Sequence, residues 1–313
     1  MNKLLRDLTD GERTTIRVLL SSRSRGVTAK GAPYLSFVLQ DKSGTMDAKY
    51  WNVPESALEL YQAGMIVDAS GDVLSHNHQL QFRIKQLDIV EETVEARSFA
   101  QEGPLSVEVL RERIEACLEN IQNENLKRLI DAVYEKYRSD FYEYPAATKN
   151  HHDFVGGLAT HVLGMLDLAE MLAAQYPILN RDLLVSGVFL HDLGKLQELS
   201  GAIVPSYTME GRLLGHISLF QAEVAKIAAS LGIEDCEEVT LVRHMILSHH
   251  GVYEYGSPVL PMIPEAEVLH LIDNLDARMN TIEKALNATE EGAFTPRIFA
   301  LENRSLYKSK IKK

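Results

Sequence analysis

The chain has very little cysteine, only Cys117 and Cys236 in 313 residues, and the two lie far apart in the sequence. Such a pair supports neither a disulfide framework nor a zinc site made of thiolates. Long apolar runs, a signal peptide and a polybasic anchor are also missing, so we expect a cytoplasmic protein without a membrane partner. Positive charge is scarce, with 32 basic against 44 acidic residues and a formal net charge of -12. This balance argues against wholesale binding to a nucleic-acid backbone, although local basic segments remain able to bind it.

The residues that are present are typical of a soluble globular protein, with 45% hydrophobic and 24% charged side chains. A length of 313 residues allows two domains, each with its own core. We expect a multidomain fold with an all-β OB-fold barrel in residues 1–95, a linker and bracing helices in 96–150, and an all-α helical bundle in 151–313. Apolar residues at helical spacing over 105–121 and 126–137 predict the bracing helices.

The barrel is predicted from the order of secondary structure in the N-terminal third. Alternating apolar and polar residues indicate five strands, and Pro54 opens a short helix between the third and the fourth. Strand, strand, strand, helix, strand, strand is the order of a five-stranded OB-fold barrel. The expected strands cover residues 14–22, 34–40, 45–51, 65–74 and 79–90, and the expected helix covers 54–62.

A motif of the two middle strands runs from Tyr34 to Trp51. Its sequence is Tyr-Leu-Ser-Phe-Val-Leu-Gln-Asp-Lys-Ser-Gly-Thr-Met-Asp-Ala-Lys-Tyr-Trp. It resembles the OB-fold nucleic-acid binders of the tRNA-anticodon-binding type, which bind oligonucleotides across the middle strands and the first connector. Aromatic rings stack on bases and cations follow the phosphates. A place in the core is the competing interpretation for each aromatic residue, and strand alternation lets only one of Tyr50 and Trp51 face a groove. The candidates for nucleic-acid binding are Arg23, Arg25, Lys30, Lys49, Trp51 and Phe82.

Nine of the eleven histidines lie between His151 and Asp273, and such clustering is hard to explain by structure alone. The cluster is organised around Val188-Phe-Leu-His-Asp-Leu-Gly-Lys, an apolar run that predicts a buried helix ended by Gly194. The imidazole and the carboxylate of His191-Asp192 are costly in apolar surroundings unless something pairs with them, and a bound metal would do so. Side chains converging from several helices are how a bundle builds a metal site. The other candidate ligands are His161, His216, His249, His250 and Asp273.

Some neighbouring residues have open roles at this stage. Asp276 competes with Asp273 as a ligand, because residues three apart share one face of a helix. Surface or core positions are expected for His244 and His270. His151 and His152 could line the site, cap the first helix or support the site from behind, whereas Arg212 could bind phosphate or support the site from behind.

The order of His161, His191-Asp192 and Asp273 resembles the HD superfamily of metal-dependent phosphohydrolases, whose pattern is His…His-Asp…Asp. The extra histidines resemble those of its two-metal members, which include cyclic-dinucleotide phosphodiesterases. The resemblance implies one metal held by His161, His191, Asp192 and Asp273, and a second held by Asp192 as a bridge together with His216, His249 and His250. Imidazole and carboxylate ligands without thiolate suit manganese, iron, cobalt or zinc, and we favour manganese.

Two such metals could hold a bridging hydroxide and clamp the attacking and leaving oxygens of a phosphodiester during hydrolysis. Lys195 lies one turn past Asp192 and could offset the charge that builds up on the phosphate. The same lysine follows His-Asp-x-Gly in two-metal members of the superfamily. A solvated lysine beyond a helix end is the competing interpretation.

An OB barrel and an HD domain in one chain of this length resemble the YhaM family of 3′→5′ exoribonucleases from Gram-positive bacteria. The residues that carry the resemblance lie in 151–161, 189–195, 210–217 and 249–258, and through Asp273. The resemblance implies manganese-dependent release of nucleoside 5′-monophosphates from the 3′ end of single-stranded RNA. It also implies self-association into a homo-oligomer. Single-stranded DNA as a further substrate stays open.

Two other functions are compatible with the same residues. One is hydrolysis of a small nucleotide, such as an alarmone or a cyclic dinucleotide, with the barrel in a regulatory role. Deletion of residues 1–95 would then leave turnover largely intact. The other is a non-catalytic DNA-binding factor in which the barrel carries the function. The complete set of candidate ligands argues against that second alternative.

Overall fold

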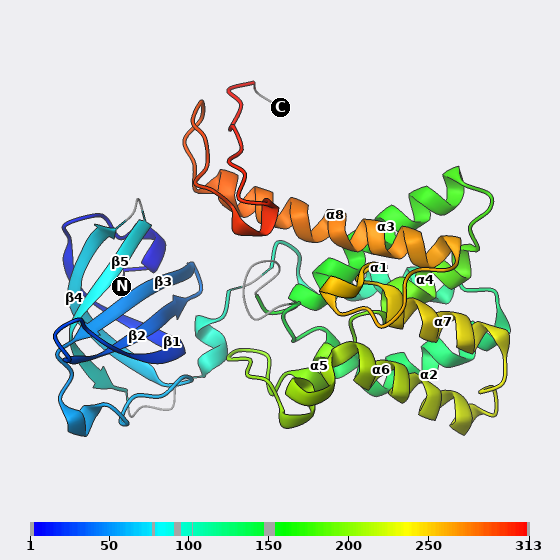
Figure 1. Cartoon of the computed structure of the whole chain (residues 1–313), viewed down its shortest axis with the longest axis horizontal. Coiled ribbons are helices and arrows are strands. Elements are labelled where there is room, and N and C mark those ends of the chain that lie inside the picture. Colours follow the sequence, from blue (N-terminus) through cyan, green and yellow to red (C-terminus); the bar gives the residue numbers. More distant parts are fainter. Residues whose placement is uncertain (1–2, 77–78, 91–94, 102, 147–153, 312–313) are drawn as a thin grey trace. The chain divides into compact units, whose positions relative to one another are not determined.

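The chain divides into two units, Met1–Glu102 and Gly103–Lys313. The first is built from strands and the second from helices (Figure 1). The computed structural model describes residues 3–76, 79–90, 95–101, 103–146 and 154–311. His151 and His152, which the sequence places near the candidate site, therefore lie outside the described residues.

The first unit is a closed five-stranded barrel with the strand order β1-β2-β3-β5-β4. Neighbouring strands are antiparallel except for β3 and β5, which pair in parallel. This is an OB-fold barrel, so the predicted fold of the N-terminal part is confirmed. Alternation along β2 buries Leu35, Phe37 and Leu39 in the barrel core. The strands are β1 (Arg13–Val27), β2 (Pro33–Asp41), β3 (Gly44–Trp51), β4 (Ile66–His76) and β5 (Gln79–Ile89).

The first strand is longer than the sequence pattern predicts. After an irregularity between Leu20 and Ser22, the polar residues of β1 continue to pair with β2 as far as Val27. Arg23 and Arg25 consequently lie on a strand, beyond the end that the sequence predicted at residue 22. The pairing with β2 supplies hydrogen bonds that outweigh the polar, turn-like composition of this stretch.

The helix expected over residues 54–62 is wrong. Only a single 3-10 turn, Glu55–Ala57, forms there. Val53, Leu58 and Tyr61 are buried in the barrel core, and the hydroxyl of Tyr61 donates a hydrogen bond to the carbonyl of Leu87 at 2.9 Å. Their spacing does not follow a helical period, so burying all three side chains requires an irregular backbone.

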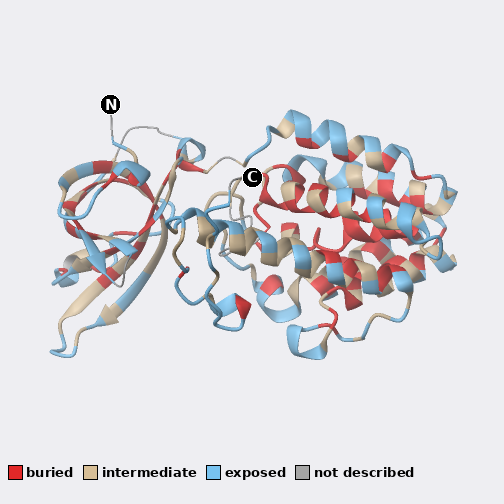
Figure 2. Ribbon diagram, turned by 90° about the horizontal axis from the view of Figure 1, so that it is seen from above, coloured by how far each residue is buried: buried red, intermediate tan, exposed pale blue. Residues whose placement is uncertain are grey.

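The second unit is a helical bundle around one hydrophobic core, as predicted. Figure 2 shows the buried residues gathered between its helices. Side-chain caps begin several helices: Ser106, Asn123, Asn180 and Thr208 each accept a hydrogen bond from a backbone N–H of the first turn. The helices are α1 (Val107–Glu119), α2 (Glu124–Phe141), α3 (Gly157–Gln175), α4 (Arg181–Leu190), α5 (Lys195–Glu198), α6 (Met209–Leu231), α7 (Glu237–Ser248) and α8 (Pro264–Asn287).

The first two helices are part of this core. Leu110 and Ile114 of α1 and Leu129 and Ile130 of α2 belong to the same buried cluster as the apolar residues of α3 and α4. The cluster holds α3 and α4 side by side and positions the ends of both for the site.

α3 is long and apolar enough, by length and composition, to cross a membrane. Half of its most apolar window is buried inside the bundle, which is how the core helix of a globular unit also passes this test. It packs between α1, α4 and α8 and buries His161 among its apolar residues. Its composition follows from this central place in the bundle.

The segment that follows α8 folds back on itself. We call residues 289–311 the C-terminal arm. Phe294 pairs with Tyr307 and Ile298 pairs with Arg304 in isolated antiparallel bridges. The arm therefore forms a narrow hairpin-like structure at the end of α8.

Candidate metal centre and nucleic-acid face

The first group of candidate ligands comes from three helices of the bundle. His161 lies on α3, Asp273 lies on α8, and His191 and Asp192 directly follow the last residue of α4. The Nε2 atom of His161 is 3.4 Å from Oδ1 of Asp273 and 3.7 Å from Oδ2 of Asp192. Nε2 of His191 is 3.4 Å from the same Asp192 oxygen. One cation of ordinary ligand distance fits among these atoms.

The second group lies on the other side of Asp192. His216 is on α6, and His249 and His250 directly follow α7. Nε2 of His216 is 3.6 Å from Oδ1 of Asp192, and Nε2 of His249 is 3.7 Å from it. Ligand atoms of His216, His249 and His250 all lie within 4.8 Å of one another.

Asp192 is shared by the two groups. Its Oδ2 atom faces His161 and His191, and its Oδ1 atom faces His216 and His249. A carboxylate that turns one oxygen to each group has the arrangement of a bridging ligand. The structure thus brings together all seven residues that the sequence proposed as ligands.

Three of the histidines are held by backbone carbonyls. A carbonyl oxygen only accepts a hydrogen bond, so Nδ1 carries a proton, and in the neutral ring Nε2 then keeps its lone pair. In each ring this leaves Nε2 as the atom available to a metal. The Nδ1 atoms of His191, His249 and His250 donate to the carbonyls of Val188, Ile246 and Tyr255 at 2.8, 2.8 and 2.7 Å.

The other two histidines are held by carboxylates. Nδ1 of His161 lies 2.6 Å from Oδ2 of Asp276, and Nδ1 of His216 lies 3.3 Å from Oε1 of Glu198. Asp276 and Asp273 therefore both reach His161, one on each side of the ring. Carboxylates in this position orient a ligating imidazole and make it more basic. Sequence reasoning missed Glu198, whose only signal is its position one helical turn after Lys195.

The buried polar atoms of the two ligand groups indicate whether cations fit between them. Nε2 of His191, His216 and His249 and Oδ1 of Asp192 are buried, and none has a hydrogen-bond partner within the described parts of the chain. Leaving such an atom unsatisfied costs about 1–3 kcal/mol. Divalent cations coordinated by these atoms would remove that cost, so the donor set fits the metal that the sequence implied.

The protonation states of His249 and Asp192 agree with metal binding. Burial lowers the pKa of His249 well below its ordinary value, so its ring is neutral at pH 7. Burial alone would raise the pKa of Asp192, but the positive charge of Lys195 and the adjacent His191 hold it well below the usual range. The site therefore presents a neutral imidazole and an ionised carboxylate, which are the forms that ligate metals.

Lys195 begins α5 and pairs with the shared carboxylate. Its Nζ atom lies 2.5 Å from Oδ2 of Asp192, and the side chain is 15% exposed. An ammonium group has three N–H donors, so two remain for another acceptor. The competing interpretation, a solvated lysine beyond a helix end, does not describe this buried contact.

Gly194 has a different role from the one expected. α4 already ends at Leu190, and Gly194 has ordinary right-handed helical dihedrals, so it does not stop the helix. A Cβ atom on Gly194 would lie only 2.3 Å from the carbonyl oxygen of His216. Glycine is required because the backbone of α6 passes this close to the segment after Asp192. The close approach brings His216 to the shared carboxylate.

His244, His270 and Arg212 lie outside the two ligand groups. Arg212 is exposed on α6, one turn before His216. His244 accepts a hydrogen bond from the backbone N–H of Met262 at 3.0 Å, and Nδ1 of His270 donates to the carbonyl of His249 at 3.1 Å. His270 thereby supports the backbone that carries a candidate ligand.

Aromatic and basic side chains share one outward face of the barrel. The rings of Tyr34 and Trp51 lie 4.6 Å apart between centroids, and Nζ of Lys49 lies 5.3 Å from the centroid of Tyr34. Lys49 also donates to the hydroxyl of Ser36 at 2.5 Å, and it pairs in register with the exposed Arg83 of β5. We call Tyr34, Ser36, Lys49, Trp51 and Arg83 the outer barrel face.

The sequence prediction missed Tyr34, Ser36 and Arg83 of this face. Tyr34 crosses over Gly26 of β1, where a Cβ atom would lie 2.3 Å from its ring. Arg83 could have been found by alternation, because its neighbours Phe82 and Ile84 face the core. Aromatic rings beside cationic groups are typical of surfaces that bind single-stranded nucleic acid.

The other proposed nucleic-acid residues have different places. Phe82 is wrong as a groove residue, because its ring is fully buried in the barrel core and cannot stack on a base. Arg23 binds its own chain: its guanidinium donates to the carbonyl of Leu58. Arg25 at the end of β1 and Lys30 in the following turn are exposed. Trp51 is 39% exposed, so it faces solvent and the alternative of a core position does not hold.

Comparison with known protein families agrees with this site. Residues 158–278 match the family model of the HD domain, which is less than half of the chain. The matched range includes His161, both residues of the His191-Asp192 pair and Asp273. The second unit thus contains a domain of the metal-dependent phosphohydrolase type.

The barrel is similar to solved OB-fold structures. The second OB-fold domain of replication protein A from Methanococcus maripaludis is 23% identical, covers 30% of this chain and 100% of its own, and gives a TM-score of 0.25. PriB from Ralstonia solanacearum is 19% identical over 25% of this chain and 97% of its own, with a TM-score of 0.22. The single-stranded DNA binding protein from Thermus aquaticus is 16% identical over 29% of this chain and 43% of its own, with a TM-score of 0.24.

Proposed function

We propose that this protein is a metal-dependent 3′→5′ exoribonuclease that hydrolyses single-stranded RNA to nucleoside 5′-monophosphates in the cytoplasm. The observation that carries the proposal is Asp192, which turns one oxygen to each of two histidine groups whose Nε2 atoms point inward. A paired site of this kind suits phosphodiester hydrolysis. The 3′→5′ direction and the choice of RNA rest on the resemblance to the YhaM family.

The residues of the site hold and orient the reacting groups. His161, His191, Asp192 and Asp273 would hold one divalent cation, and Asp192, His216, His249 and His250 would hold the other, with manganese favoured. Bound cations supply Lewis acidity toward the phosphate and lower the pKa of water. Asp276 and Glu198 fix the rings of His161 and His216.

Lys195 has a separate role in this proposal. It keeps Asp192 ionised, and its two remaining N–H groups can donate to a phosphate oxygen of the substrate. Such a donor stabilises the charge that increases on the phosphate during hydrolysis. A neutral side chain of similar length at position 195 should therefore lower turnover more than substrate affinity.

The barrel supplies a surface for the strand. Tyr34 and Trp51 offer stacking faces, and Lys49 and Arg83 offer positive charge for phosphates. Single strands bind OB folds across this part of the sheet. Stacking on aromatic rings tolerates any base, so this surface suits an enzyme that shortens strands of varied sequence.

A digestion of oligonucleotides tests the proposal. The full chain is incubated with 5′-labelled single-stranded RNA, with manganese and with chelator. We expect a ladder that shortens from the 3′ end, with nucleoside 5′-monophosphates as products, only when the metal is present. The Asp192→Ala variant should be inactive, whereas Asp131→Ala, which removes an exposed carboxylate of α2, should digest normally.

Several results would contradict the proposal. Wild-type protein that leaves the strand intact with every divalent metal would refute the nuclease. Activity of Asp192→Ala equal to that of wild type would refute the bridge. Equal digestion of DNA would extend the substrate, because a preference for RNA requires contacts to the 2′-hydroxyl. Hydrolysis of cyclic dinucleotides with intact RNA would favour the small-nucleotide alternative.

We further propose that the chain forms homo-oligomers, as the resemblance implies. The helical unit exposes large apolar side chains, among them Leu213 at 75% and Phe299 at 86%. Apolar surface of this kind is often covered by another protein surface. Sedimentation equilibrium measures the mass directly, and a monomer at micromolar concentration would contradict this part of the proposal.

A further inference from the structure

A hollow of about 690 Å³ lies along α8, and one of its lining residues contacts a candidate metal ligand. Asp276 lines one end of it, and the same carboxylate holds Nδ1 of His161 at 2.6 Å. At the other end the hollow is lined by Asn287 and by Tyr307 and Lys308 of the C-terminal arm. Its volume is that of a ligand site. The hollow therefore ends at a side chain that contacts the candidate ligand His161.

A polar stripe follows one face of α8 from the metal centre along the hollow. Residues three and four apart on a helix lie on the same face. Asp273, a candidate ligand, is followed on this face by Asp276, Asn280, Glu283 and Asn287. From Asp276 to Asn287 the stripe is about 16 Å long at 1.5 Å per residue. That length matches about four to five stacked nucleotides at ~3.4 Å each.

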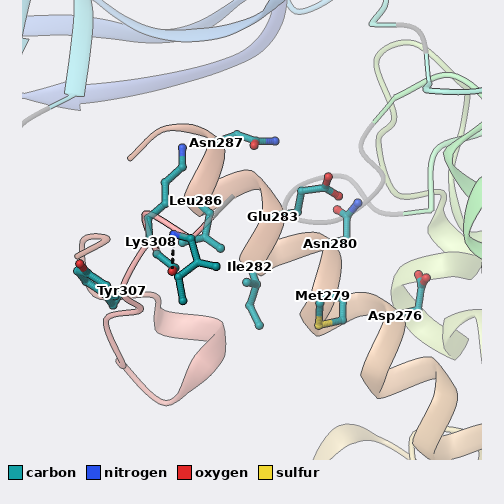
Figure 3. A pocket seen from close by; sticks show the side chains of 11 residues that line it. Asp276, Met279, Asn280, Ile282, Glu283, Leu286, Asn287, Tyr307 and Lys308 are labelled. Carbon is teal, nitrogen blue, oxygen red and sulfur yellow. Dashed lines mark hydrogen bonds between the residues drawn. The ribbon is translucent and has the colours of Figure 1, made fainter. Parts of the chain in front are cut away.

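The C-terminal arm presents a lysine and aromatic rings, whereas this face of α8 presents carboxylates and amides. Figure 3 shows Asp276, Asn280 and Glu283 projecting from one side of α8, with Tyr307 and Lys308 on the other side. Lys308 donates to the carbonyl of Thr289 at 2.7 Å, which leaves two of its N–H groups for another acceptor.

Two exposed aromatic rings lie next to this lysine. Tyr307 is 50% exposed and Phe294 is 66% exposed, and their ring centroids are 5.2 Å apart. Paired rings with a neighbouring cation are suited to bases and phosphates of a single strand. Tyr307 and Lys308 of the C-terminal arm thus line a hollow whose other end is lined by Asp276.

We infer that the hollow between α8 and the C-terminal arm binds the 3′-terminal nucleotides of a single-stranded nucleic acid and directs them to the metal centre. This inference rests on the proposed function and names the path of its substrate. The strand lies with its phosphates toward Lys308, because Asp276 and Glu283 on the α8 side repel them. Its bases stack on the ring of Tyr307.

Steady-state kinetics on two substrates tests the path. An oligonucleotide of ten residues fills the hollow, whereas bis(4-nitrophenyl) phosphate reaches only the metal centre. Tyr307→Ala should raise KM for the oligonucleotide about tenfold, because one stacked base is lost. Lys308→Ala should raise it about threefold and reduce its dependence on salt, because one phosphate contact is lost. Both effects should be larger on the oligonucleotide than on the small phosphodiester.

Matched controls come from the same unit. Tyr176→Ala removes a tyrosine that is 53% exposed at the end of α3, and Lys226→Ala removes an exposed lysine of α6. Both should behave as wild type. Tyr307→Phe keeps the ring and should restore the oligonucleotide KM, which separates stacking from misfolding.

Cross-linking provides a readout that does not need turnover. RNA with 4-thiouridine as the second nucleotide from the 3′ end, irradiated with the full chain in chelator, should label a peptide that contains Tyr307. Labelling confined to barrel peptides, together with an unchanged KM for Tyr307→Ala, would overturn the inference. Wild-type protein that does not shorten the strand would instead refute the proposed nuclease itself.

Discussion

Replacing Gly194 by alanine should remove one of the two proposed metal positions. The glycine lies two residues after Asp192, and the backbone of α6 passes directly over it. Its dihedrals of φ -60° and ψ -20° suit any residue, so alanine introduces no backbone strain. The closest conflict is with the carbonyl oxygen of His216, which a Cβ atom would meet at 2.3 Å, and the Cβ atom of Phe220 would lie 2.9 Å away.

The size of the effect follows from the distances. To reach an ordinary contact of ~3.5 Å, the carbonyl of His216 must retreat by about 1.2 Å. Nε2 of His216 is now 3.6 Å from Oδ1 of Asp192. Two ligands with bonds of ~2.1 Å to one ion can be at most about 4.2 Å apart. If the retreat adds fully to this separation, the two atoms end about 4.8 Å apart and no longer share an ion.

Metal analysis of the purified protein measures the result. After loading with manganese and dialysis, the wild type should retain two ions per chain and Gly194→Ala about one. The conflict should also destabilise the helical unit by about 1–3 kcal/mol, seen as a lower melting temperature in chelator.

Gly187→Ala is the matched control. Its Cβ atom would meet the end of the Met245 side chain at 2.1 Å, and a methionine side chain can move aside. It should retain two ions. If Gly194→Ala also retained two ions at wild-type affinity, the close approach of α6 would not position His216, and the reasoning would be refuted.

Three further predictions concern other parts of the molecule. Asp276→Asn should weaken manganese binding about 10- to 100-fold, because His161 loses its charged partner. Isothermal titration calorimetry measures the affinity, and an unchanged value would contradict the role of that carboxylate. Trp51→Ala should weaken RNA binding by about 1–3 kcal/mol in fluorescence anisotropy, whereas Ile89→Ala, similarly exposed at the end of β5, should not. Burial raises the pKa of Tyr142 from 10.0 to about 12, so the folded state keeps this proton longer than the unfolded state does. Its contribution to stability is complete below pH 10 and is lost as the pH rises to about 12, and urea unfolding of Tyr142→Phe should depend less on pH in this range.

The fold could be predicted from the sequence because the apolar patterns of strands and of helices are both periodic. Alternation gave the strands of the barrel, and apolar residues at helical spacing gave the helices of the bundle. The order of strands then identified the OB fold. The prediction failed at residues 54–62, where three buried side chains hold an irregular backbone, and at Gly194, where the reason for glycine is a neighbouring helix. Neither contact has a signature in local sequence.

The candidate ligands could be found from the sequence because histidine and aspartate at apolar helix ends are unusual. The residues that orient them could not. Glu198 is an ordinary acidic residue of a short helix, and only the fold brings it to His216. Asp276 was recognised as a rival of Asp273, whereas the two carboxylates contact different atoms of one ring.

The anchors of the five histidines are of two kinds, and each proposed metal position contains both. His191, His249 and His250 are oriented by main-chain carbonyls, which any sequence that folds this way would supply. His161 and His216 depend instead on acidic side chains from other helices. Substitution of Asp276 or Glu198 alone would change how strongly one histidine donates electrons to its metal. The geometry of the two metal positions would stay the same, because the backbone sets it.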